Sequence, residues 1–224
     1  MAMEDNGPIP FTYMPPEGPL QVLHADKDIL VVVKPCGLLS VTGRGEGRED
    51  ALATRAPQLF KGARIVHRLD LDTSGVMVLA QTAEAHRHLG LQFERRHTDK
   101  TYIARVWGHV AEDEGEVDLP LVVDWPNRPK QMICHETGRR ALTNWEVIAR
   151  EEKTTLMRLK PVTGRSHQLR VHMLSLGHPI IGDPLYAEGE ALAASPRLQL
   201  HAHDLTIHHP SGGERLTFVA ECPF

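Results

Sequence analysis

The stretch of sequence that decides the fold is Arg64–Ala80, which reads RIVHRLDLDTSGVMVLA. Its two ends are short runs of valine, isoleucine and leucine. Between them stand a histidine, an arginine, two aspartates, a threonine, a serine and a glycine. Apolar runs separated by turn-forming residues are typical of two strands joined by a loop. We therefore predict that this polar loop is held rigidly at the edge of a sheet.

The loop contains a local charged pair, because Arg68 precedes Asp70 by two residues. A carboxylate beside a cation stays ionised and nucleophilic at neutral pH, which suits a catalytic group. The same residues also fit an ordinary turn, in which Asp72 bonds the backbone ahead of it. The loop alone leaves both interpretations open.

The string His67–Gly75 resembles the active-site motif of the RluA-type pseudouridine synthases, His-Arg-Leu-Asp-x-x-Thr-Ser-Gly. The chain also contains the other sequence blocks of that family in their usual order, one before this motif and four after it, so that the resemblance spans roughly residues 20 to 220. These blocks are Lys34-Pro35-x-Gly37-Leu38, Lys100-x-Tyr102, Gly164–His172, Gly182–Tyr186 and Leu200-His201-Ala202.

The resemblance implies an α+β pseudouridine synthase fold: a central mixed, mainly antiparallel sheet flanked by helices and loops, with a catalytic cleft across the sheet. It also implies an enzyme that converts uridine to pseudouridine in structured RNA without a cofactor or a metal. The target base has to leave the stack, because chemistry on a base is not possible inside a helix.

The resemblance also implies roles for single residues. Asp70 is the catalytic carboxylate acting at the ribose, and whether it adds covalently or removes a proton stays open. Tyr102 packs against the uracil and is a candidate base at C5. Leu200 supplies an apolar contact to the base, Arg68 fills the gap left by the flipped nucleotide, and His67 supports the loop.

Two arginines belong to the block Gly164–His172, which contains the start of a predicted helix. Arg165 stands at the helix entrance, where a cation opposes the helix dipole, so pairing with a carboxylate is its simplest explanation. The resemblance names that carboxylate as Asp70. Arg170 lies five residues further on, roughly 140° around the helix, and we expect it to face phosphate.

Two further segments suggest RNA contact without requiring it. Trp125 stands beside Arg128 and Lys130 in a proline-containing loop, which suits stacking on an unpaired base and equally suits a surface hairpin. Arg96 lies in the last turn of a predicted helix, where a cation either compensates the helix dipole or contacts phosphate. Both alternatives stay open.

Hydrophobic periodicity and turn residues predict the regular elements. We expect one catalytic domain over residues 20–224, a flexible arm over 1–19 and an exposed connecting loop over 40–50. The expected strands are Leu20–His24, Ile29–Val33, Thr101–Trp107, Leu121–Val123, Leu142–Arg150, Thr155–Pro161, one near Ile180, Leu198–Ile207 and Arg215–Val219, and the expected helices are Ala83–His97 and Ser166–Leu176.

Composition limits the class of protein. The chain has 224 residues, a formal net charge of -4 and a pI of about 6.4, so RNA contact requires a local patch. Three distant cysteines predict free thiols in a reducing compartment. The amino terminus lacks a basic and then apolar leader, and no apolar run approaches the ~18 residues needed to cross a bilayer. We therefore expect a cytoplasmic protein without a membrane partner.

Metal and nucleotide cofactors are not expected. The fourteen histidines form no metal-binding spacing with an acidic residue, and the glycines of residues 43–47 lack the Lys-Ser/Thr of a phosphate-binding loop. Many members of the family that the chain resembles carry an S4-type RNA-binding domain, and there is no room for one before Leu20. That absence, the loop over residues 124–131 and the short chain resemble the dual-specificity members, which act on a large-subunit rRNA hairpin and a tRNA anticodon stem-loop. We also expect a monomer. The alternatives are a synthase for another RNA site, a noncatalytic RNA-binding protein and a metal-dependent nuclease.

Overall fold

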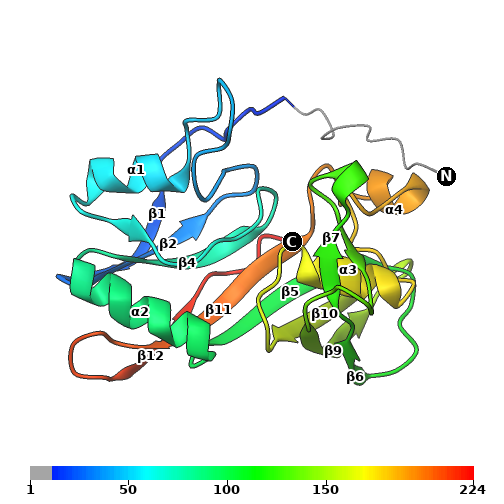
Figure 1. Cartoon of the computed structure of the whole chain (residues 1–224). Helices are drawn as coiled ribbons and strands as arrows, with labels where there is room; N and C mark the ends of the chain where they lie inside the picture. Colours follow the sequence, from blue (N-terminus) through cyan, green and yellow to red (C-terminus); the bar gives the residue numbers. More distant parts are fainter. Residues whose placement is uncertain (1–11) are drawn as a thin grey trace. The chain divides into compact units, whose positions relative to one another are not determined.

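The computed structural model describes residues 12–224, which form two compact units. The motif unit comprises Tyr13–Ile103 and Leu200–Phe224, and the inserted unit comprises Ala104–Gln199. Figure 1 colours both by sequence position, and each is described by itself below. The single catalytic domain expected over residues 20–224 stays a prediction.

The motif unit is built on a mixed, mainly antiparallel sheet, as predicted. Strand β2 pairs antiparallel with β1 and with β4, β3 pairs antiparallel with β4, and β11 pairs antiparallel with β12. The parallel pairing is the one between β4 and β11. The strands are β1 (Gln21–Ala25), β2 (Ile29–Lys34), β3 (Arg64–Ile65), β4 (Ser74–Ala80), β11 (Leu200–His208) and β12 (Arg215–Val219).

Strands β2 and β4 form the centre of this core, and every residue of β4 is buried. In Figure 1 they run between helices α1 (Leu52–Leu59) and α2 (Ala83–Arg95), which add apolar residues to the core. Because both faces of these strands are covered, their sequences are almost continuously apolar. The predicted strand, loop and strand over residues 64–80 is confirmed.

Helix α2 begins where the sequence predicts, because the Thr82 side chain accepts a hydrogen bond from the Ala85 backbone N–H at 3.0 Å. It ends two residues before the predicted His97. Arg96 adopts a left-handed conformation, with φ of 61°, and stops the helix.

The strands of the inserted unit are also antiparallel: β9 pairs with β10 and with β6, and β7 and β8 form a separate two-stranded sheet. The elements are β6 (Glu114–Asp118), β7 (Leu121–Val123), the 3-10 turn η1 (Trp125–Asn127), β8 (Gln131–Ile133), β9 (Leu142–Arg150), β10 (Thr154–Pro161), α3 (Gln168–Ser175) and α4 (Gly189–Ala193). Strand β5 (Asp99–Trp107) contains the boundary between the units.

Three expectations need correction. The helix expected at Ser166 begins at Gln168, because His167 takes a left-handed conformation with φ of 53°. The strand expected near Ile180 is an isolated bridge to Val106. The amino-terminal arm is anchored in its described part, because the Tyr13 hydroxyl donates to the Asp50 carbonyl at 2.7 Å. Residues 1–11 of that predicted arm lie outside the described residues.

None of the helices in the part of the chain that the structure describes has the length and apolar character that crossing a bilayer requires.

Candidate active site

The loop that carries Asp70 is fixed through the residue before it. The Ser40 hydroxyl donates to the Leu69 carbonyl at 2.7 Å, and the Leu69 N–H donates to the same hydroxyl oxygen at 3.1 Å. Ser40 and Leu69 are both buried. A buried hydroxyl that serves both backbone groups of one residue leaves that residue little freedom to move.

The residue after Asp70 is fixed as well. The Lys34 ammonium, at 0% exposure, donates to the carbonyls of Leu71 (3.0 Å), Leu38 (2.7 Å) and Pro35 (2.9 Å), and the Gly37 N–H also donates to the Leu71 carbonyl at 3.0 Å. A buried ammonium is tolerated where acceptors surround it. Both chain neighbours of Asp70 are therefore held by the segment 34–40, Leu71 by the first sequence block and Leu69 by Ser40 just after it.

The motif histidine connects the loop to β4 and α2, and its supporting role stays a prediction. The Val78 N–H donates to Nε2 of His67 at 3.1 Å, and the His67 ring stacks on Phe93 with 4.4 Å between ring centres. Burial, followed by the positive charge of Lys100, lowers the pKa of His67 to about 3. The ring is therefore neutral at physiological pH, with Nε2 as an acceptor.

Tyr102 and Asp70 interact electrostatically within the motif unit. Burial raises the pKa of the Tyr102 hydroxyl, and the charge of the Asp70 carboxylate raises it further. The phenol is consequently protonated at neutral pH. As a base at C5 of uracil it would first have to lose this proton, whereas packing against the ring requires no such change.

The end of the motif loop lies against the start of β11. Ser74 is paired with His201, and Leu200, which begins β11, is 2% exposed. The predicted contact of Leu200 with the base stays a prediction. Arg68 and Arg96 are both exposed on this unit, as RNA contacts require, and their role also stays a prediction.

Arg165 belongs to the inserted unit. Its Nε donates to the Arg140 carbonyl at 3.1 Å, and its backbone N–H donates to the Gln168 side chain at 3.0 Å. These contacts set the chain just before α3. The pairing of Arg165 with Asp70, which lies in the motif unit, stays a prediction.

The expectation that Arg170 faces phosphate is wrong. Its side chain is 2% exposed and forms a bidentate pair with Asp183, with Nε and Nη2 donating at 2.8 and 2.6 Å. Its guanidinium also lies over the Tyr186 ring, 5.1 Å from the ring centre. The sequence block Gly182–Tyr186 contained this acidic partner, but spacing alone could not assign it.

The Trp125 loop presents an aromatic ring with cations beside it. Trp125 is 63% exposed, and the Arg128 guanidinium lies over its ring at 4.5 Å. The Lys130 ammonium lies 6.0 Å from the centre of the Tyr186 ring. This arrangement suits stacking on an unpaired base. RNA contact through Trp125, Arg128 and Lys130 stays a prediction.

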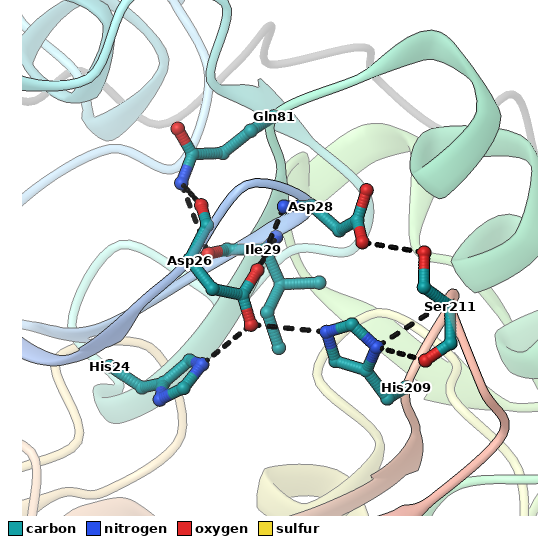
Figure 2. A network of polar contacts seen from close by, with 7 residues as sticks. All are labelled: His24, Asp26, Asp28, Ile29, Gln81, His209 and Ser211. Carbon is teal, nitrogen blue, oxygen red and sulfur yellow. Dashed lines mark hydrogen bonds and ion pairs between the residues drawn. The ribbon is translucent and has the colours of Figure 1, made fainter.

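Side chains of the types that bind metal ions lie close together at another place in the motif unit, shown in Figure 2. Among the described residues, Asp26, Asp28 and His209 bring ligand atoms within 4.8 Å of one another. Nε2 of His24 and Nε2 of His209 donate to one Asp26 oxygen at 2.8 and 3.0 Å. We call His24, Asp26, Asp28, His209 and Ser211 the turn cluster. Its ligand atoms bind one another, and the absence of a metal stays a prediction.

Comparison with known proteins gives concordant matches. The family model described as RNA pseudouridylate synthase matches residues 28–175. The dual-specificity RNA pseudouridine synthase RluA of Yersinia pestis is 56% identical over 204 residues, which cover 91% of this chain and 99% of that protein. The protein of the same name from Escherichia coli (strain K12) is 55% identical over 214 residues, covering 95% and 98%. The solved structure of human RNA pseudouridylate synthase domain containing 1 is similar, with a TM-score of 0.77 and 29% identity over 94% of this chain and 87% of that one.

Proposed function

The chain belongs to the RNA pseudouridylate synthase family, and we propose that it isomerises uridine to pseudouridine in structured RNA with Asp70 as the catalytic carboxylate. The anchoring of both chain neighbours of Asp70 supports this assignment most directly. Ser40 holds Leu69, and Lys34 holds Leu71. Such anchoring positions a side chain whose reaction depends on sub-ångström geometry.

The reaction conserves all atoms of the nucleotide. The bond between N1 of uracil and C1′ of ribose breaks, the uracil turns, and a bond forms between C5 and C1′. The proton on C5 leaves and N1 gains one, so the step needs no oxidant or reductant. Asp70 acts at the ribose, either by adding to C1′ or by removing a proton, and Tyr102 packs against the turning ring.

In this proposal the remaining residues position the catalytic carboxylate or contact the RNA. Arg165 pairs with Asp70, Leu200 contacts the base, and Arg68 occupies the gap left by the extruded nucleotide. Because the chain is 55% identical to a dual-specificity relative over 95% of its length, we infer two RNA substrates, a large-subunit rRNA hairpin and a tRNA anticodon stem-loop.

The test incubates each stem-loop with the wild-type protein, Asp70→Asn and Asp72→Asn, both with and without EDTA, and measures pseudouridine and strand scission. Asp72 provides a matched control, because it carries the same charge in the same loop and falls in a variable position of the motif. We expect product on both RNAs from the wild type and from Asp72→Asn. Asp70→Asn should bind both RNAs and form none.

Other outcomes identify the alternatives. Binding without product by the wild type would make the protein a noncatalytic RNA-binding protein. Strand scission that EDTA abolishes would make it a metal-dependent nuclease. Product on only one of the two stem-loops would leave the activity in place and overturn the dual specificity.

A further inference from the structure

A buried serine and histidine connect the end of the motif loop to strand β11. Oγ of Ser74 lies 2.8 Å from Nδ1 of His201, although the two residues are 127 positions apart in the sequence. Both side chains are buried, and His201 is 1% exposed. Neither residue has a role in the chemistry proposed above.

The direction of this hydrogen bond follows from the other side of the ring. Nε2 of His201 lies 3.1 Å from the carbonyl oxygen of Ala220, which can only accept. Nε2 therefore carries the proton in the neutral ring, and Nδ1 is left as an acceptor. The Ser74 hydroxyl donates to Nδ1, so that one polar chain runs from the motif loop through His201 to Ala220.

The backbone pairing between β4 and β11 is short. The parallel pairing of β4 with β11 consists of His201 opposite Ser74 and Ala202 opposite Gly75. The strands approach so closely that a Cβ on Gly75, whose φ is 125°, would lie 2.2 Å from the Ala202 carbonyl oxygen. The side-chain bond between Ser74 and His201 joins the same two residues that pair across the strands, so it adds to the contacts that hold this register.

This register determines the positions of two of the proposed functional residues. Asp70 lies four residues before Ser74, and Leu200 directly precedes His201. We propose that His201 is a positioning residue for the isomerisation, which holds the Asp70 loop and Leu200 in register by accepting the Ser74 hydroxyl. This inference rests on the proposed function. A displacement of about 1 Å at a reacting group lowers turnover about 10²-fold.

The same strand offers a matched control. Nδ1 of His203 lies 2.9 Å from the same Ala220 carbonyl oxygen, two residues further along β11. A variant at His203 therefore perturbs the contact between β11 and Ala220 without altering the acceptor for Ser74. It separates the effect on the motif loop from a general effect on the strand.

Two replacements at His201 test its two hydrogen bonds separately. In His201→Gln the side-chain amide can keep the donor to Ala220 but removes the acceptor at the Nδ1 position. In His201→Asn the amide oxygen stands near the Nδ1 position and can accept from Ser74. Ser74→Ala removes the donor itself.

Steady-state isomerisation of a stem-loop is measured for each variant, with thermal unfolding as a check of folding. We expect His201→Gln and Ser74→Ala to lower kcat about 10²-fold with KM for the RNA unchanged. His201→Asn should recover to within about tenfold of wild type, and His203→Gln should match wild type. The double variant Ser74→Ala/His201→Gln should lose no more than either single variant, because both remove the same bond.

Several results would overturn the inference. Wild-type kcat in His201→Gln and Ser74→Ala would do so while leaving the proposed function intact, provided that Asp70→Asn is inactive. An equal loss in His203→Gln, or a loss confined to KM, would reduce His201 to a structural residue. If His201→Gln unfolds, His201→Asn decides alone: a folded Asn variant that is as slow as Ser74→Ala contradicts the proposal. Failure of the wild type to isomerise uridine is a separate result, which concerns the proposed function.

Discussion

Two aspartates of the motif unit, Asp70 in the motif loop and Asp26 in the turn cluster, lie in differently built surroundings. Around Asp70, Ser40 and Lys34 bind the backbone of its neighbours Leu69 and Leu71. At Asp26 the carboxylate itself is occupied: one oxygen accepts the N–H groups of Asp28 and Ile29, each at 2.8 Å, and the other accepts both histidine donors (Figure 2). The four hydrogen bonds of the Asp26 carboxylate serve stability, and the anchored backbone on both sides of Asp70 suits a group that must be positioned for a reaction.

The two regions also differ in their response to protons. The motif histidine His67 is kept neutral, with a pKa of about 3, because it is buried and close to Lys100. At Asp26, burial opposes the charge, but hydrogen bonds from His24, the backbone and His209 outweigh it and lower the pKa. At His209, burial likewise opposes the charge, but bonds to Ser211 and Asp26 together with the charges of Asp26 and Asp28 raise the pKa. His209 therefore binds its proton more tightly than an ordinary histidine, whereas His67 stays neutral at physiological pH.

The largest expected effect extends the comparison to Asp183, another carboxylate saturated by the protein. It is 0% exposed, and its oxygens accept from Arg170 and from the N–H groups of Leu185 and Tyr186. Asp183→Asn leaves Arg170 buried without its charge partner, so we expect the free energy of unfolding to fall by about 3–5 kcal/mol. Denaturant titration measures it.

The control for this prediction is the exposed pair of Arg140 and Asp118, whose nitrogen and oxygen lie 3.0 Å apart. Asp118→Asn should change the free energy of unfolding by less than about 1 kcal/mol, because exposed pairs contribute little. Equal losses in the two variants would show that saturation and burial of a carboxylate do not determine its contribution.

How much of this could be predicted from sequence follows from the range of each interaction. Apolar runs reveal buried strands, so β2 and β4 were predicted, alternating apolar residues indicated β10, and Thr82 marked the start of α2. Helix α1 was missed because Ala51 at its amino end provides no side-chain cap and Pro57 lies inside it. Strand β6 was missed because four of its five residues are exposed.

Contacts between residues far apart in the sequence were harder to predict. The motif identified Asp70, but His209 lies 183 residues from Asp26, and no local pattern relates them. Ser74 and His201 were each part of a recognised block, yet their hydrogen bond depends on the parallel pairing of β4 with β11. Arg170 was misassigned for the same reason, since its partner follows it by 13 residues in an irregular segment.

An intermediate effect is expected from the turn cluster itself. Asp26→Asn removes a charge that accepts four hydrogen bonds, so we expect the free energy of unfolding at pH 7 to fall by about 2 kcal/mol. The kcat of isomerisation should stay within about twofold of wild type at temperatures where the variant is folded. Denaturant titration and a turnover assay measure the two quantities. A loss of turnover in the folded variant would contradict the assignment of Asp26 to stability and of Asp70 to the reaction.

The smallest expected effect is the pH dependence of the turn cluster. The folded pKa of Asp26 is lowered, so its contribution to stability is present above its unfolded value of about 4 and is lost as the pH falls below it. The folded pKa of His209 is raised, so its contribution is fully present below its unfolded value of about 6.5 and is lost as the pH rises through the folded value. Both contributions coexist between about pH 4 and pH 6.5. The stability difference between the wild type and His209→Gln should therefore be larger at pH 5.5 than at pH 8.5, by up to about 1 kcal/mol. Denaturant titrations at both pH values measure it, and a difference that grows toward pH 8.5 would contradict the charged pairing of His209 with Asp26.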